Sequence, residues 1–205
     1  MKKKYLENID IIHLKVDKDK KIRQLVFKHR KKIFHTQLLK KENLKNLYNF
    51  FQSFNELEKS YFPYPLFKPI DINYINFVEK YDNYSKNEKN WTYQLLYKGK
   101  RLIGLSLIKK IGIKNNKYEK SKSPTSGIFI KRNYRKKNLG LILQNIILYQ
   151  AKLMNLRKLY VRVSSSNKGS QKVYMKNGFK KTGNSFLTSN QSGKKWLDEE
   201  FVILL

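Results

Sequence analysis

One stretch of the sequence constrains the fold more than any other: Ile128–Ala151, which reads IFIKRNYRKKNLGLILQNIILYQA. Its pattern predicts a short buried strand, a basic turn and an apolar helix. The turn at residues 135–140 precedes a helix N-terminus, where unpaired backbone N–H groups and the helix dipole favour a phosphate. Asn138 and Gly140 are residue types that tolerate a left-handed or crowded backbone. We therefore hypothesise a pyrophosphate cradle; the alternative is an ordinary strand–turn–helix unit whose lysines serve solubility.

The composition is that of a single folded domain in a chain of 205 residues. Hydrophobic residues make up 40% and aromatic residues 14%, which suffices for a core and argues against disorder. The absence of cysteine excludes disulfides, thiolate metal sites and a cysteine nucleophile. The histidines, His13, His29 and His35, are not at zinc-motif spacing, so we expect no metal.

The sequence predicts no membrane segment. No apolar run approaches about 18 residues, which a spanning helix requires. The N-terminus begins with basic residues, but its apolar run is short and is interrupted by Glu7 and Asp10, which does not fit a signal peptide. We therefore expect a cytoplasmic protein with no membrane partner.

The formal net charge is +30 and the pI is about 10.1. One interpretation is an anionic or RNA-associated partner. The other is compositional drift, because most basic residues are Lys, whereas nucleic-acid surfaces favour Arg for bidentate contacts. Both interpretations remain open. No Asp or Glu occurs between Glu119 and Asp198, so the charged side chains around the basic turn are all cationic.

Alternation and helical spacing predict the other elements. Strands are expected at residues 8–16, 22–28, 32–38, 92–97, 101–111, 127–131, 158–163, 179–187 and 196–204. Helices are expected at 42–54, 71–81, from the basic turn to about 155, and through 176 from a cap at Ser166 or Asn167, with Gly178 as the stop. The proline-rich aromatic loop at 60–67 either walls a pocket or packs on the core. This order predicts a mixed α/β sheet with one parallel crossover and helices on both faces.

A second informative stretch is Asn167–Phe179, NKGSQKVYMKNGF. It reads as a capped helix with a tyrosine near its end. Asn167 and Tyr174 are seven residues apart, which is two turns, so they share a helix face. The Tyr174 phenol could donate a proton to a leaving group, or it could simply pack in the core.

Together the two stretches resemble the GNAT superfamily of N-acetyltransferases. Arg135-x-x-Asn138-x-Gly140 is similar to that family's acyl-CoA loop, R/Q-x-x-G-x-G/A, with Asn in place of the first Gly. The helix segment is similar to the family's N-x-x-A/S-x-x-x-Y-x-K-x-G-F. The resemblance is specific over about residues 90–185. It implies a mostly antiparallel mixed sheet with a central parallel pair splayed into a V.

The resemblance also implies roles for individual residues, with acetyl-CoA as co-substrate. The strand backbone at Ile128, Phe129 and Ile130 would bind the pantetheine arm. Asn167 would contact the pantetheine or a nearby water, and Tyr174 would protonate the departing thiolate. The pyrophosphate would be held by the basic turn, namely Arg135, Lys136, Lys137, Asn138, Leu139, Gly140 and Leu141.

A general base is not assigned. Many members of the family use a carboxylate on the strand before the loop, and residues 125–130 contain none. The carboxylates that remain as candidates are Glu56, Glu58, Asp71, Glu79, Asp198, Glu199 and Glu200. A water relay or an already neutral amine would also serve.

We expect one domain over residues 1–205, with an N-terminal β extension (1–31), a variable acceptor-side half (32–124) and an acyl-CoA-binding half (125–205). The expected activity is direct transfer of an acetyl group from acetyl-CoA to an amine acceptor of unknown class, by a monomer or homodimer. The alternative is a non-catalytic, basic protein associated with nucleic acid or the ribosome on the same fold.

Overall fold

A computed structural model describes residues 4–55, 58, 73–78, 91–109, 124–189 and 195–205. In these ranges the strands are β1 (Asp10–Val16), β2 (Ile22–His29), β3 (Lys32–Leu38), β4 (Trp91–Lys98), β5 (Arg101–Lys109), β6 (Thr125–Ile130), β7 (Lys158–Ser164), β8 (Lys180–Ser189) and β9 (Lys195–Leu204). The helices are α1 (Leu44–Gln52), α4 (Leu139–Leu153) and α5 (Lys168–Lys176), with 3-10 turns η1 (Lys4–Leu6), η2 (Lys41–Asn43) and η4 (Arg132–Tyr134).

These strands form one sheet in the order β1-β2-β3-β4-β5-β6-β7-β9-β8. Every neighbouring pair is antiparallel except β6 and β7, which are parallel. The last strand, β9, lies between β7 and β8, so the C-terminal hairpin adds to the sheet through its second strand. The predicted mixed, mostly antiparallel sheet is therefore confirmed.

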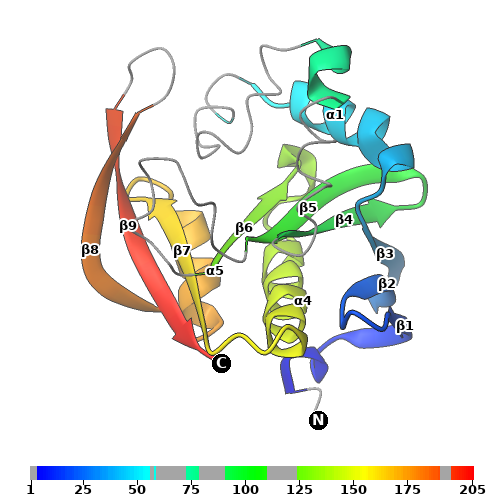
Figure 1. The fold of residues 1–205 in the computed structure, drawn as a ribbon, viewed down its shortest axis with the longest axis horizontal. Helices are drawn as coiled ribbons and strands as arrows, with labels where there is room; N and C mark the ends of the chain where they lie inside the picture. The colour runs from blue at the N-terminus through cyan, green and yellow to red at the C-terminus, as the bar shows by residue number, and fades with distance from the viewer. Residues whose placement is uncertain (1–3, 56–57, 59–72, 79–90, 110–123, 190–194) are drawn as a thin grey trace.

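The parallel pair is splayed. Strands β6 and β7 share a single residue pair, Thr125 with Tyr160, and the Tyr160 N–H donates to the Pro124 carbonyl across 2.8 Å. Beyond that pair the two strands draw apart (Figure 1). On its other side β6 is paired with β5 along its whole length. The sheet thus opens between β6 and β7, as the family resemblance implied.

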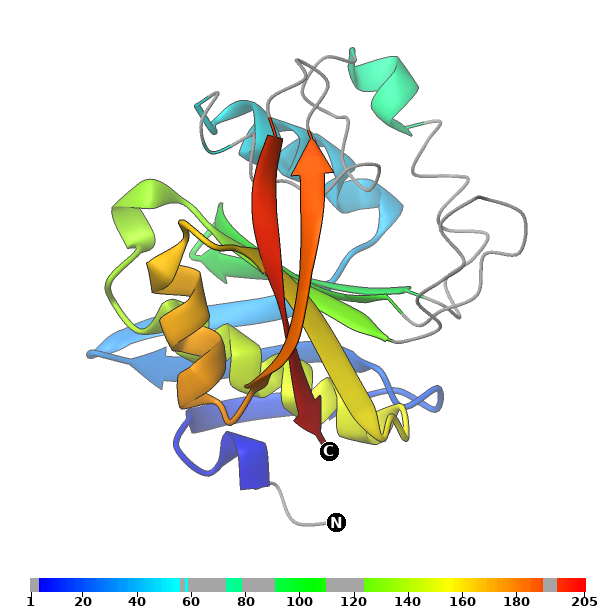
Figure 2. The same cartoon turned by 90° about the vertical axis from the view of Figure 1, so that its left-hand side faces the viewer.

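Helices cover both faces of the sheet (Figure 2). On one face α4 packs against the centre of the sheet, where Leu143 and Ile146 meet Phe27 and Leu96. On the opposite face α1 packs its phenylalanines against Leu95 and Leu105 of β4 and β5. This arrangement follows from the alternation of β4, because successive side chains along a strand point to opposite faces.

The last strands of the chain also pack against helices on the face of the sheet that α4 covers. Val161 and Val163 of β7 and Phe201 of β9 pack with α4 and α5 in one buried cluster. By alternation, the intervening residues of β7 and β9 turn to the α1 side of the sheet.

The sequence predicted most of these elements within a few residues. The hairpin of β4 and β5 is confirmed, and the helix after the basic turn ends at Leu153. Asn167 caps α5 by accepting the Ser170 N–H at 3.1 Å, and Gly178 follows the helix with φ of 86°. Of the helix predicted at 71–81, residues 74–78 are helical. The predicted aromatic loop at 60–67 lies outside the described residues.

Candidate functional site

The basic turn forms a helix N-terminus with a left-handed cap. Asn138 has φ of 62°, and the first backbone bond of α4 runs from the Ile142 N–H to the Asn138 carbonyl at 3.1 Å. The N–H groups of Leu139, Gly140 and Leu141 precede that bond, so the helix itself gives them no acceptor. The predicted left-handed backbone at Asn138 is confirmed. These N–H groups and the helix dipole suit an anion.

Three cationic residues, Arg135, Lys136 and Lys137, directly precede that helix end. The Arg135 Nε donates to the Ile130 carbonyl at 2.9 Å, which ties the turn to the end of β6. The Lys137 Nζ donates to the Asn133 carbonyl at 2.7 Å. Lys136 is exposed and its backbone is left-handed, with φ of 57°. The sequence did not indicate this second left-handed position, because lysine is not a residue type that favours it.

Strand β6 presents backbone groups to the opening. The Lys131 N–H donates to the Ile103 carbonyl of β5 at 2.9 Å, and backbone groups alternate in direction along a strand. Ile128 and Ile130 therefore turn their N–H and C=O groups away from β5, toward β7. Among the described residues, β7 supplies no register partner for either. The Ile130 carbonyl accepts a hydrogen bond from Arg135. Among the described residues, the Ile130 N–H and the N–H and C=O groups of Ile128 are therefore available to a ligand.

Helix α5 closes the site from the other side. A methyl group added at Gly140 would lie 3.6 Å from the Val173 side chain and 3.7 Å from that of Ile130, so α5, α4 and β6 meet there. At the start of α5 the Asn167 Oδ1 accepts the Ser170 N–H. Its Nδ2 therefore faces away from the helix, and no described residue accepts a hydrogen bond from it. The structure thus brings together Ile130, Gly140 and the helix that begins after Asn167.

Tyr174 is buried. Its ring packs edge-on against Phe179, with centroids 5.3 Å apart, in the cluster that Ile128 also contacts. Burial raises the pKa of the Tyr174 hydroxyl, so at neutral pH the phenol holds its proton and can only donate it. The two interpretations of Tyr174 are thus compatible, because its ring is part of the core and its cluster reaches the strand beside the opening.

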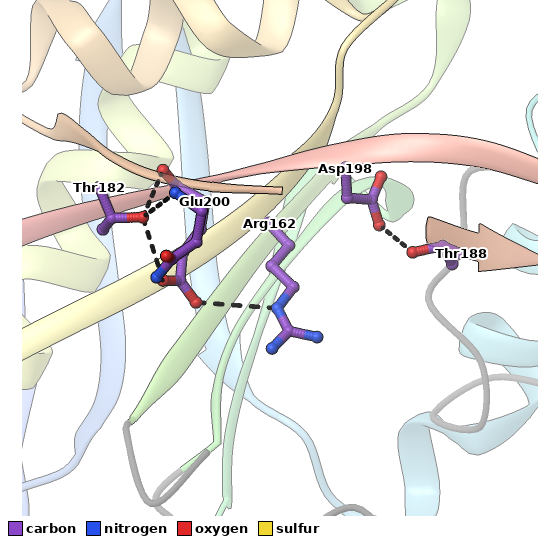
Figure 3. Close-up of polar contacts among 6 residues, drawn as sticks. Arg162, Thr182, Thr188, Asp198 and Glu200 are labelled. Carbon is purple, nitrogen blue, oxygen red and sulfur yellow. Dashed lines mark hydrogen bonds and ion pairs between the residues drawn. The ribbon is translucent and has the colours of Figure 1, made fainter. Parts of the chain in front are cut away.

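The four candidate bases that lie within the described residues are engaged by other groups. Glu58 pairs with Arg135, and Glu199 pairs with Lys181, each at 2.7 Å. Asp198 and Glu200 lie in the network on the α1 face of β9 (Figure 3). The other three candidates, Glu56, Asp71 and Glu79, lie outside the described residues.

Two contacts to the basic turn were missed from the sequence. The His29 Nε2 lies 2.8 Å from the Lys137 carbonyl, so the N-terminal extension touches the turn. Glu58 reaches the turn from just beyond α1. Its carboxylate and the Asn55 side chain each accept the other's backbone N–H, at 3.2 and 2.9 Å. This reciprocal pattern is a capping box, and its signal in the sequence is Asn-x-x-Glu at residues 55–58.

The described residues contain no group of three or more His, Cys, Asp or Glu side chains that could hold a metal ion. Among the helices in the described ranges, none is long and apolar enough to cross a membrane.

Comparison with known proteins decides the family. The sequence model described as "Acetyltransferase (GNAT) family" matches residues 51–179. The chain belongs to the GNAT acetyltransferase family. The match includes the basic turn, the opening between β6 and β7, and α5. A search of curated proteins finds no match.

Solved structures of GNAT proteins share the fold at low sequence identity. A GNAT-family acetyltransferase from Streptococcus pneumoniae has 20% identity and a TM-score of 0.63, over 84% of this chain and 99% of that one. Spermidine N-acetyltransferase from Vibrio cholerae, in complex with CoA and spermine, has 21% identity and a TM-score of 0.66, over 83% and 95%. Ribosomal-protein-S5-alanine acetyltransferase from Vibrio fischeri has 14% identity and a TM-score of 0.68, over 83% and 92%.

Proposed function

We propose that this GNAT protein transfers an acetyl group from acetyl-CoA to an amine acceptor. One observation carries the proposal: Gly140, in the first turn of the helix that follows Asn138, lies beside Ile130 on the β7-facing edge of β6, where no described residue pairs with Ile128 or Ile130. The helix end suits a pyrophosphate. The strand edge suits an amide-bearing arm, which can add to it as a further strand would.

The proposed roles follow that arrangement. The N–H groups of Leu139, Gly140 and Leu141 hold the pyrophosphate, and Lys136 and Lys137 add positive charge. Ile128 and Ile130 bind the pantetheine through their backbones. Phe129 turns its backbone to β5 by the same alternation, so its predicted contact is not part of this proposal. The Asn167 Nδ2 donates to a carbonyl of the same arm.

Bound acetyl-CoA supplies the thioester. The acceptor nitrogen forms a bond to the acetyl carbon, the carbon–sulfur bond breaks, and the sulfur takes a proton. Tyr174 is proposed as the donor of that proton, because its buried hydroxyl holds a proton at neutral pH. The amine loses its own proton to a group that we do not assign. Action in the cytoplasm, as a monomer or homodimer, stays a prediction.

A thermal-shift measurement and an acetyl-transfer assay test the proposal. Acetyl-CoA at about 100 times its Kd should stabilise the fold by about 2.7 kcal/mol. Inorganic pyrophosphate should not reproduce that effect, because it lacks the arm that β6 binds. Radiolabelled acetyl should then appear on at least one amine in a panel of polyamines, amino acids, amino sugars and ribosomal peptides. No stabilisation and no transfer would overturn the proposal.

The net charge of +30 favours a second candidate, a basic RNA-associated protein on this fold. This candidate predicts RNA binding that weakens steeply as salt rises, because binding to phosphates releases counterions. The same thermal-shift experiment distinguishes the two, since the second candidate predicts no effect of acetyl-CoA.

A further inference from the structure

Arg162 lies at the opening between β6 and β7, on the face of the sheet opposite α4. It follows Tyr160, the last residue of β7 that pairs with β6, by two positions, which is roughly 6.6 Å along the strand. Its neighbours Val161 and Val163 point into the α4 and α5 cluster, so Arg162 points to the α1 side. The pyrophosphate cradle is on the α4 side. A group held in the opening would therefore emerge beside Arg162.

The acidic residues on this face are already occupied by neighbouring donors. Glu200 is paired with Arg162 in the strand register, and its Oε1 accepts from the Thr182 hydroxyl at 3.2 Å and the Asn184 amide at 3.0 Å (Figure 3). Its remaining oxygen, Oε2, lies 3.8 Å from the Arg162 Nε. Glu200 is also buried, so it is a poor first contact for a cationic acceptor.

Asp198 is engaged in the same way. Its Oδ1 accepts the Trp196 indole N–H at 2.9 Å, and its Oδ2 accepts the Thr188 hydroxyl at 2.8 Å. Each carboxylate oxygen can accept a second hydrogen bond. Asp198 can thus still attract an ammonium group electrostatically, but its position is fixed by the hairpin of β8 and β9.

Arg162 differs from both acids because much of its guanidinium is available. The guanidinium carbon lies 3.5 Å from the centroid of the Phe186 ring, a stacking contact that holds the plane in place. The side chain is 40% exposed. Within the described residues its ion pair with Glu200 is made on the Nε side, and Nη1 and Nη2 make no hydrogen bond. These two nitrogens form the fork that binds carboxylate and phosphate groups.

We propose that the amine acceptor carries an oxyanion, either a carboxylate or a phosphate, and that Arg162 binds it. The proposal rests on the proposed acetyl transfer and adds the chemical class of its acceptor. A stacked, exposed guanidinium beside the opening favours an acceptor with both an amine and an anionic group. A fully cationic polyamine would meet Arg162 with like charge.

Matched pairs of amines test this inference with the full chain and acetyl-CoA. The carboxylate arm compares glycine, β-alanine and 6-aminohexanoate with their amides, and the phosphate arm compares phosphoethanolamine with ethanolamine. Spermidine serves as the polycationic comparison. We expect kcat/KM for at least one anionic member to exceed that of its neutral partner by about tenfold or more, since charged hydrogen bonds are the strong ones. The two arms distinguish carboxylate from phosphate.

Arg162→Gln is the diagnostic variant, and Arg157→Gln is its matched control. Arg157 is exposed and precedes β7, roughly 16 Å along the chain from Arg162. Arg162→Gln should reduce the anionic-to-neutral ratio to about one, mainly by raising KM for the anionic amine, because the lost contact is equal in ground and transition states. The control should leave the ratio within about twofold. Acetyl-CoA affinity should be unchanged in both.

The outcomes separate this inference from the proposed function. Transfer to neutral amines or spermidine without a preference for anionic partners overturns the role of Arg162 and leaves acetyl transfer intact. A preference that survives Arg162→Gln also overturns it. The wild-type ratios decide the acceptor class even if the variant fails to fold. Transfer to none of these amines, with no stabilisation by acetyl-CoA, overturns both.

Discussion

The Arg135 Nη2 lies 2.7 Å from the Glu58 Oε1, an ion pair that joins the basic turn to the residues just beyond α1. The Glu58 side chain is only 13% exposed, whereas that of Arg135 is 43% exposed. The family resemblance assigns Arg135 to phosphate binding. The Glu58 carboxylate, which belongs to the acceptor-side half, therefore neutralises part of its charge. Its Nε remains on the Ile130 carbonyl.

Glu58→Gln should tighten acetyl-CoA binding. The change removes one negative charge next to a polyanion site, and Gln can keep the capping box with Asn55. We expect Kd for acetyl-CoA to fall by roughly threefold to tenfold at low salt and by less at high salt, because salt screens the interaction. Calorimetry at two ionic strengths measures this. Glu42→Gln, at an exposed residue, is the control. Weaker acetyl-CoA binding by Glu58→Gln would contradict the prediction and would show that the ion pair serves to position Arg135.

Asn138 should tolerate glycine but not valine. Its φ of 62° is favourable for Gly and costs a β-branched residue about 1–3 kcal/mol. Asn138→Val should therefore lower the free energy of unfolding by that amount in urea titrations and weaken acetyl-CoA binding, because the N–H groups after it would be reoriented. Asn138→Gly should stay within about 0.5 kcal/mol of the wild type. Equal stability of the two variants would contradict a left-handed cap.

Gly140 offers a test of the cradle with a matched pair of substitutions. A methyl group there would make ordinary contacts, at 3.6 Å to Val173 and 3.7 Å to Ile130, so Gly140→Ala should fold and bind acetyl-CoA. Gly140→Glu adds a longer side chain and a negative charge in the first turn of α4, where acidic residues stabilise a helix. The fold should survive, while acetyl-CoA affinity should fall by at least about tenfold through repulsion. Unaltered acetyl-CoA binding by Gly140→Glu would show that the cofactor binds elsewhere.

Local signals accounted for most of the elements. Asn138 was predicted to be left-handed and Gly178 to end a helix because these residue types carry their conformational preference with them. The family motifs located the opening, since they fix which strand precedes and which follows α4. The position of β9 between β7 and β8 was not predicted, because strand order depends on long-range pairing that alternation does not encode.

The parts of the site that the sequence missed are long-range contacts. Glu58 pairs with Arg135, and His29 contacts Lys137, across segments with no shared local pattern. Arg162 did carry a signal: a charged residue in the interior of the strand Lys158–Ser164, between two buried valines. Alternation alone gives such a residue a solvent-facing position. Only the opening beside it indicates a ligand.

His35 should make stability depend on pH. Its ring stacks on Tyr97, with centroids 5.0 Å apart, and burial lowers its pKa in the folded state. Between the folded pKa and the unfolded value of about 6.5, the unfolded chain binds more protons, so stability falls as pH drops below about 6.5. Unfolding midpoints in urea from pH 7.5 to 6 measure the effect. The dependence of the unfolding midpoint on pH should become weaker in His35→Gln. It should persist in His13→Gln, because His13 is exposed in the wild type. An equal pH dependence in the two variants would contradict the role of His35.

Tyr174→Phe should separate catalysis from cofactor binding. The phenyl ring keeps the packing against Phe179, so the fold and the Kd for acetyl-CoA should change little. Loss of the hydroxyl removes the proposed proton donor, and general acids typically contribute about 100-fold or more, so kcat should fall by at least about tenfold. Single-turnover rates and calorimetry provide the two readouts. Tyr149→Phe, on the buried face of α4, is the matched control, and an unchanged kcat in Tyr174→Phe would assign Tyr174 to the core alone.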